Sequence, residues 1–215
     1  MSPSPLDSQS PSTRHSLNRV RLPRPRFESG VSIEEALRRR RSVREFKKGE
    51  PMNLEEVSQL LWSLSGITQR EGGRTSPSAG ALYPLEISLL AGDVLGLPAG
   101  LYRFDPHGHD LQLVAEGDRR EQLARCALDQ SAIKDAAMVI VVSAVYERTT
   151  MKYGKRGTRY VHFEVGHAAQ NVYLQAVSLG LGVVAVGAFD DEAVKRSVEL
   201  REGEEPQYLL SLGRK

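Results

Sequence analysis

A long amphipathic helix that runs directly into a buried strand constrains the fold of this chain more than any other feature. In "RYVHFEVGHAAQNVYLQAVSLGLG", apolar residues recur at steps of four or three and form one continuous stripe: Val161, Val165, Ala168, Val172, Ala176 and Leu179. Gly180 and Gly182 end the helix, and the apolar run "VVAVGAF" that follows reads as a buried strand. The chain therefore needs a fold that combines helices with a sheet.

Further helices and strands alternate along the rest of the chain. Helix signals stand at four more places: a Ser32–Glu35 capping box, an Asn53 cap with a stop at Gly66, Asp118 before a pattern that reaches Asp129, and Asp190. Strand patterns are "LEISLLAG", "GLYRFDPHGHDLQLV" with a turn at 105–109, "AAMVIVVSAVY" and "QYLLSLG". Because helices and strands are interleaved and one pair reads as a hairpin, we predict an α+β fold with a mixed central sheet flanked by helices.

Composition limits the possible partners and compartments. The 215 residues carry a formal charge of only +2, which gives no reason to expect nucleic acid, and no apolar run is long enough to span a membrane. The first 27 residues are rich in Ser, Pro and Arg and contain no hydrophobic block, which excludes a secretory signal. A single cysteine, Cys126, suits a reducing compartment. We predict a disordered tail over 1–30, one domain over 31–215, and a cytoplasmic protein.

Two motifs have the residue types of a cofactor site. In "SPSAGALYP" the side chains are so small that backbone could approach something flat or crowded, although a simple tight turn explains the same residues. In "RRRRSVREF" the guanidinium groups of Arg40, Arg41 and Arg44 surround Ser42, a combination that suits a phosphate. Arginines at the end of a helix also simply complement its dipole, so both interpretations stay open.

Two further groups of titratable residues could carry chemistry. Lys152 and Tyr153 are adjacent and could supply a proton donor and acceptor if burial lowers the lysine pKa, or they could belong to a solvated basic loop. Glu164 and His167 have the Glu-x-x-His spacing of carboxylate-bridged metal sites, but no other Glu has a His three residues on. Structural hydrogen bonds explain these histidines equally well. Dinucleotide, P-loop and hydrolase motifs do not occur.

Taken in order, the motifs resemble the flavin-dependent nitroreductase family. The matching stretches are "RRSVREF", "PSAGALYP", "GHAAQNVYLQAVSLGLG" and "VGAFD", and the resemblance runs from about residue 37 to residue 214. "PSAGALYPLE", "MKYGKRGTRYVHFEVGHAAQN" and "EEP" resemble more closely the SagB-type dehydrogenase branch, which includes the azoline oxidases of peptide modification. Ordinary nitroreductases carry an Asn and a Gln where this chain has Ala81 and Tyr83.

The resemblance implies a homodimer that holds FMN at the subunit interface. It assigns Arg40, Arg41 and Ser42 to the phosphate and ribityl chain, Arg44 and Gln130 to the pyrimidine edge, Gly187 and Ala188 to the hydride-accepting nitrogen, and Arg214 to a further phosphate contact. It also implies that Pro77, Ser78, Ala79 and Ala81 cross from the other subunit and lie along the flavin ring.

The same resemblance makes Lys152 and Tyr153 the catalytic pair. The implied function is an FMN-dependent oxidoreductase that passes hydride between flavin and a small-molecule or peptide substrate, with NAD(P)H as a possible electron donor. An NAD(P)H-dependent nitro or quinone reductase is the first alternative, and a flavin- or metal-binding module without turnover is the second. Because the stripe that contains Val172 is built from small and branched residues, we expect it to form the dimer face.

Overall fold

A seven-stranded sheet forms the centre of the molecule. The computed structural model describes residues 18–69 and 71–215. The strands lie in the order β1-β4-β3-β2-β5-β7-β6. Their bounds are β1 Arg19–Arg21, β2 Leu85–Ala91, β3 Gly100–Asp105, β4 Asp110–Glu116, β5 Met138–Val145, β6 Leu181–Val186 and β7 Glu204–Arg214. Every pairing between these strands is antiparallel, so the prediction of a mixed sheet was wrong. The interleaved helices connect antiparallel strands and not the parallel strands of crossover units.

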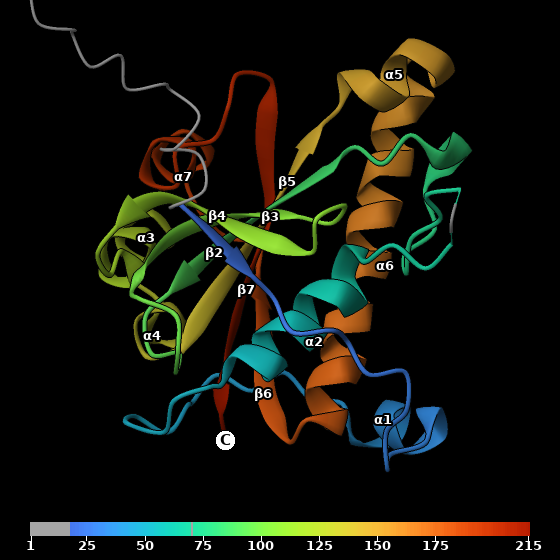
Figure 1. The fold of residues 1–215 in the computed structure, drawn as a ribbon. Helices are drawn as coiled ribbons and strands as arrows, with labels where there is room; N and C mark the ends of the chain where they lie inside the picture. The colour runs from blue at the N-terminus through green and yellow to red at the C-terminus, as the bar shows by residue number, and fades with distance from the viewer. Residues whose placement is uncertain (1–17, 70) are drawn as a thin grey trace, which may run out of the picture.

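Helices cover both faces of the sheet. Their bounds are α1 Ile33–Arg39, α2 Leu54–Ser65, the 3₁₀ turn η2 Ala79–Ala81, α3 Arg120–Cys126, α4 Ser131–Lys134, α5 Glu147–Tyr153, α6 Arg156–Ser178 and α7 Asp191–Ser197. Helices α2 and α6 pack on one face, and α3, α4 and α7 pack on the other, to the right and left of the sheet in Figure 1. Across the described part of the chain, the helices are too short or too polar to cross a bilayer.

The apolar stripe of α6 is part of the core of its own chain. Ala168, Val172 and Ala176 are fully buried against α2 and the sheet. The stripe therefore does not form a dimer face, because no surface of it is left for a second copy. The helix itself is confirmed, and so is the strand after it, which is β6. Antiparallel pairing with β7 fixes the place of β6 at the edge of the sheet.

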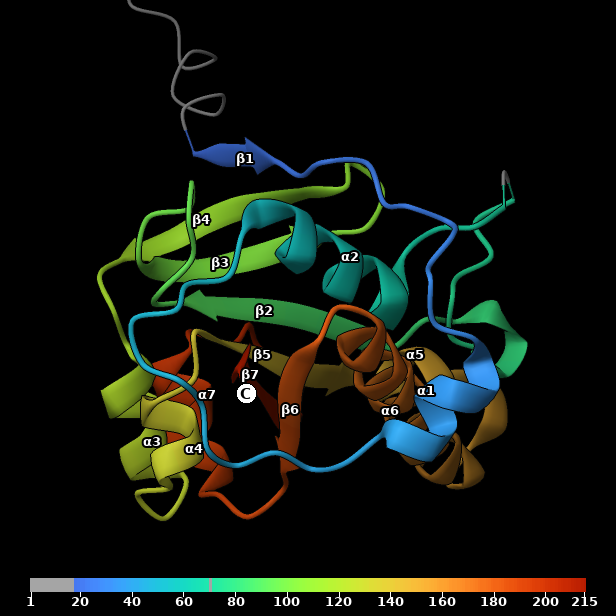
Figure 2. The same cartoon turned by 90° about the horizontal axis from the view of Figure 1, so that it is seen from below.

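The N-terminal segment joins the domain earlier than the sequence predicts. β1 pairs with β4, and the chain then crosses α2 before it reaches α1, as Figure 2 shows. Residues 18–30 therefore belong to the folded unit, which corrects the expected tail over 1–30 in this part; residues 1–17 lie outside the described residues. β1 has only three residues, and Arg19 adds an ion pair to Asp110 at 2.8 Å. A strand this short has no periodicity to reveal it.

Two helices near the site also differ from expectation. The helix predicted after Asp118 ends early, because Leu128 and Asp129 take left-handed backbone conformations with φ of 55° and 58°. Residues 147–153 form helix α5 and not a basic loop. A methyl group at Gly157 would lie 2.8 Å from the Cα atom of Thr150, so this glycine lets α5 pack directly on α6.

Candidate functional site

The small-residue loop is held in an unusual backbone conformation. Gly80, Ala81 and Tyr83 have positive φ angles of 65°, 53° and 45°. Such angles are uncommon for residues with a side chain and persist only where surrounding contacts fix them. Two contacts do so here: the Tyr83 backbone N–H donates to the Ser78 hydroxyl oxygen at 2.9 Å, and the Ser76 hydroxyl donates to the Leu64 carbonyl oxygen at 2.8 Å. The loop is thus a shaped surface with exposed backbone at its tip.

Lys152 and Tyr153 converge on this tip. A methyl group at Gly80 would lie 2.7 Å from the Tyr153 hydroxyl oxygen and 2.9 Å from Lys152 Nζ. The tyrosine ring is held edge-on against Tyr160 of α6, with ring centroids 5.1 Å apart. The pair therefore stands at the end of a helix, in contact with the loop, as an active-site pair would need. Lys152 is exposed in the described chain.

Glu164 is a buried carboxyl beneath the same loop. Its side chain is hydrogen-bonded to Ser78, and Arg74 is the nearest positive charge that acts on it. Burial raises the pKa of Glu164 to about 7, against the opposing effects of Ser78 and Arg74. His167, the other member of the Glu-x-x-His motif, is exposed. The sequence motif suggested only a metal-ligand role for Glu164. Its burial could have been predicted, because Glu164 is adjacent to Val165 of the apolar stripe.

Arg40 and Ser42, which follow α1, lie beside a tyrosine of α6. The Ser42 hydroxyl lies 3.2 Å from the Tyr173 hydroxyl, and the Arg40 guanidinium lies over the Tyr173 ring, 5.5 Å from its centroid. The Tyr173 hydroxyl oxygen also accepts from the Ala185 N–H of β6 at 2.8 Å. Within residues 18–69 and 71–215, no carboxylate lies within 4.0 Å of the guanidinium of Arg40, Arg41 or Arg44. Unpaired guanidinium groups beside a hydroxyl are a donor set that fits a phosphate.

The remaining predicted residues lie at two other points. Gln130 Nε2 donates to the Ala188 carbonyl oxygen at 3.4 Å, which brings these two predicted residues together beside Gly187. Arg214 donates to both carboxylate oxygens of Glu56, at 2.6 and 2.9 Å. The Arg214 guanidinium is therefore engaged by an ion pair, in contrast to the arginines after α1.

The Lys152–Tyr153 pair and Arg40 lie in different regions of one chain. On α6, Tyr160 contacts Tyr153 of the pair, and Tyr173 contacts Arg40. Thirteen residues of α6 separate the two tyrosines, which corresponds to about 20 Å along the helix axis.

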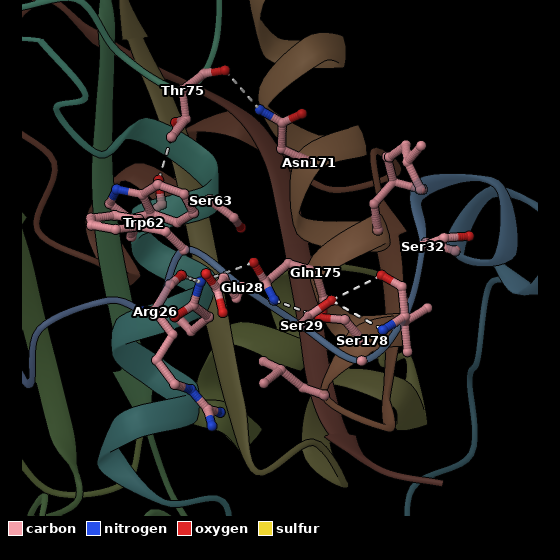
Figure 3. A pocket seen from close by; sticks show the side chains of 18 residues that line it. Arg26, Glu28, Ser29, Ser32, Trp62, Ser63, Thr75, Asn171, Gln175 and Ser178 are labelled. Atoms are coloured by element: carbon pink, nitrogen blue, oxygen red, sulfur yellow. Dashed lines mark hydrogen bonds between the residues drawn. The ribbon is translucent and has the colours of Figure 1, made fainter.

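A cavity of about 540 Å³ lies elsewhere, between the N-terminal segment and helices α1, α2 and α6. Figure 3 shows its lining, in which Asn171 of α6 donates to the Thr75 carbonyl oxygen at 3.2 Å. The rings of Phe27 and Trp62 pack there with centroids 5.6 Å apart. None of the predicted site residues lines this cavity, so its size alone does not identify it as the reaction site.

Comparisons with known proteins agree on the family. The profile of the Nitroreductase family matches residues 37–214. A nitroreductase-related protein of Methanocaldococcus jannaschii, MJ1384, is 45% identical over 185 residues, which are 86% of this chain and 92% of that protein. The microcin B17-processing protein McbC of Escherichia coli is 26% identical over 197 residues, which are 88% of this chain. The matched region is only 65% of McbC, slightly less than two thirds of its length.

Solved structures give the same fold. A nitroreductase-related protein from Ralstonia eutropha JMP134 superposes with a TM-score of 0.79 and 28% identity, covering 100% of this chain and 95% of that protein. The NADPH:FMN oxidoreductase of Vibrio harveyi, solved with NAD⁺, has a TM-score of 0.61 and 21% identity, covering 85% of this chain and 68% of that protein. The second likeness concerns the fold alone.

Proposed function

Because this chain belongs to the nitroreductase family, a family of oxidoreductases, we propose that it is an FMN-dependent enzyme of the SagB-type dehydrogenase branch. It passes hydride between flavin and a small-molecule or peptide substrate. The observation that carries the proposal is the convergence of Lys152 Nζ and the Tyr153 hydroxyl on Gly80, because it gives the loop a proton donor and acceptor at its tip. The similarity to McbC, a microcin B17-processing protein, supports the choice of branch.

The cofactor would be held mainly by the residues near Tyr173. Arg40, Arg41 and Ser42 would bind the phosphate and ribityl chain, since their donors have no carboxylate partner. Arg44 and Gln130 would face the pyrimidine edge, where a cation favours the negative charge of the reduced ring. Gly187 and Ala188 would supply backbone beside the reacting nitrogen. Arg214 would contribute only by sharing or leaving Glu56, so it is the weakest of the proposed contacts.

The loop and the catalytic pair would serve the flavin of a second copy in a homodimer. Pro77, Ser78, Ala79 and Ala81 would lie along the ring, where their small side chains permit close approach of backbone. The distance of about 20 Å along α6 between the two regions supports this arrangement, because the pair stands far from the arginines of its own chain.

FMN, when bound, supplies the acceptor or donor of hydride. In the oxidising direction Lys152 would take the proton that leaves one ring carbon of the azoline while the adjacent ring carbon loses hydride. The Tyr153 hydroxyl orients the substrate or relays that proton. Such acid–base assistance contributes roughly 100- to 10,000-fold in rate. The cofactor and the second subunit would remove Lys152 from water.

The test compares Lys152→Ala and Tyr153→Phe with Lys155→Ala, which removes a neighbouring exposed lysine beyond Gly154. FMN content and oligomeric state are measured first, and anaerobic stopped-flow reduction by a thiazoline or oxazoline peptide follows. Both site variants should retain FMN and lose roughly 100-fold or more in the rate of flavin reduction, whereas the control should not. Unchanged rates in both variants would remove the pair from the mechanism. A colourless protein that takes up no FMN would refute the cofactor assignment itself.

The nearest alternative is an NAD(P)H-dependent nitro or quinone reductase on the same fold. NAD(P)H added to the anaerobic yellow enzyme separates the two. Rapid bleaching that is independent of Lys152 would favour the reductase, because hydride transfer from a nicotinamide needs no base.

A further inference from the structure

A second cavity lies at the end of the sheet where β2 begins and β3 ends. It has a volume of about 380 Å³, and five arginines line it: Arg19, Arg74, Arg103, Arg148 and Arg201. Only two carboxylates, Glu86 and Asp105, are part of the lining. None of the residues assigned above to flavin or to proton transfer lines it, so this cavity is separate from the proposed active site.

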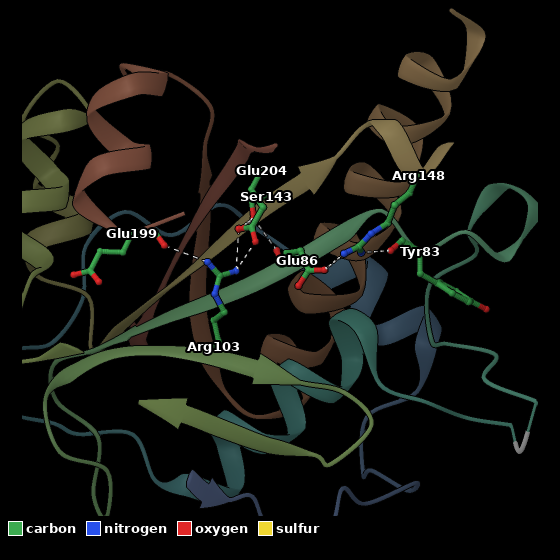
Figure 4. A network of polar contacts seen from close by, with 7 residues as sticks. All are labelled: Tyr83, Glu86, Arg103, Ser143, Arg148, Glu199 and Glu204. Carbon is green, nitrogen blue, oxygen red and sulfur yellow. Dashed lines mark hydrogen bonds and ion pairs between the residues drawn. The ribbon is translucent and has the colours of Figure 1, made fainter. Parts of the chain in front are cut away.

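The Arg103 side chain is fully committed to groups of the protein. It is 8% exposed, and its Nη1 atom donates to both carboxylate oxygens of Glu204, at 2.8 and 2.9 Å. Its Nη2 atom donates to the Glu199 carbonyl oxygen at 3.2 Å (Figure 4). This buried pair forms the floor of the cavity and is already neutral as a unit.

Two more of the five arginines are paired with carboxylates. Arg148 of α5 lies 2.5 Å from a Glu86 carboxylate oxygen. Arg19 of β1 lies 2.8 Å from Asp110 and 3.4 Å from Asp105. Both carboxylates of the lining are therefore already in ion pairs, and Glu86 acts on Arg74 only from beyond 4.0 Å.

Arg74 and Arg201 are the two lining arginines that form no ion pair among the described residues. In the part of the chain that the structure describes, neither guanidinium has a carboxylate within 4.0 Å. Arg74 is half-buried, donates through Nη1 to the Ser65 hydroxyl oxygen at 2.8 Å, and lies over the Tyr83 ring, 4.5 Å from its centroid. Burial lowers the pKa of Arg74, although the charges of Glu164 and Glu86 oppose that effect. Because no carboxylate is in direct contact with Arg74, an anion bound to its guanidinium would offset more of the cost of its burial.

We propose that this cavity is an oxyanion-binding site, which takes a small molecule bearing a carboxylate or phosphate group between Arg74 and Arg201. Guanidinium groups match both kinds of oxyanion through paired N–H donors. The volume lies in the lower part of the range that small-molecule sites occupy, so the site has room for more than a bare ion.

The cavity adjoins the small-residue loop that contains Gly80 through the contacts of Arg74 and Arg148 with Tyr83. Arg148 donates to the Tyr83 carbonyl oxygen at 3.0 Å, and Arg74 covers the ring of the same residue. Tyr83 does not line the cavity, so a ligand there would reach the loop through Arg74 and Arg148, whereas Lys152 contacts the loop at Gly80. Binding there does not compete with a substrate at the Lys152–Tyr153 pair.

The experiment is isothermal titration of the full-length protein in excess FMN, which keeps the arginines after α1 occupied. Succinate and inorganic phosphate are the two probes, at ionic strength held constant with sodium chloride. At least one probe should bind saturably, and the tighter one identifies the preferred group. Arg201→Gln, which alters an exposed side chain, should weaken binding about tenfold or more, and Arg74→Gln should do the same.

Arg196→Gln is the matched control, because Arg196 is an exposed arginine of α7 that does not line the cavity. It should leave the affinity within about twofold of the wild-type value. The proposal is overturned if neither probe binds, if Arg201→Gln binds as tightly as the wild type, or if Arg196→Gln weakens binding as much as Arg201→Gln does. None of these outcomes depends on whether the azoline peptide is a substrate.

Discussion

Glu164→Gln should make the protein more stable at alkaline pH and leave it nearly unchanged at acid pH. Glu164 is 5% exposed and lies under the loop that contains Ser78. Its burial raises the pKa from 4.5 to about 7, because desolvation disfavours the charged carboxylate. Glutamine has the same shape, can still hydrogen-bond to Ser78, and carries no charge at any pH.

The sign follows from proton binding. A carboxyl with a raised pKa binds more protons in the folded state than in the unfolded state between pH 4.5 and about 7. The stability it contributes is complete below the unfolded pKa and is lost as the pH rises through the folded pKa. A shift from 4.5 to about 7 corresponds to a loss of about 2–3 kcal/mol in the free energy of unfolding between about pH 5 and pH 8.

The assay is urea denaturation of wild type and variant at several pH values, read as the difference between their free energies of unfolding. A difference is needed because burial lowers the pKa of His109, and that residue contributes stability of the opposite sign, which rises with pH. Glu147→Gln on α5 is the control for loss of an exposed carboxylate. A difference between Glu164→Gln and wild type that stays constant from about pH 5 to pH 8 would refute the reasoning.

Two other substitutions test the geometry directly. Gly80→Ala places a methyl group within 3 Å of Lys152 Nζ and the Tyr153 hydroxyl, at a φ of 65°. We expect the variant to retain FMN and to reduce flavin more slowly, by roughly tenfold or more. A rate equal to that of the wild type would show that the pair tolerates displacement. Val172→Glu places an unpaired charge in the core and should lower the free energy of unfolding by several kcal/mol. Gln170→Glu, on the exposed side of α6, should lower it little. A Val172→Glu protein as stable as the wild type would contradict the observed burial.

Periodic elements were predictable from the sequence, and elements defined by packing were not. The apolar stripe of the 23-residue helix α6 identified that helix. The continuous apolar run of β5 identified a buried strand. Helix α5 has seven residues and only one buried side chain, Thr149. It is helical because Gly157 lets it pack on α6, and that contact joins two segments that no local pattern connects.

The site shows the same division. The motif around Ser42 suggested a phosphate-binding donor set from residue types and spacing, and that assignment stays a prediction. The resemblance to a family suggested a catalytic role for Lys152, but the contact of Lys152 with Gly80 was not predicted and comes from the fold. The burial of Glu164 and the unpaired charge of Arg74 depend on which side chains the fold brings beside them. Sequence patterns identify reactive or charged side chains. Only the fold determines which of these side chains are buried without an ion-pair partner.

The exposure of Lys152 bears on where an active centre can form. A lysine that accepts a proton near neutral pH needs a lowered pKa, and removal from water is the main way to lower it. In the single chain Lys152 stands at an open helix end, while its neighbour Tyr153 is held against Tyr160. The missing cover must come from the cofactor, from the substrate or from a second copy. The arginines that would hold a cofactor lie about 20 Å away along α6, so the cover and the pair come from different chains in the arrangement proposed here.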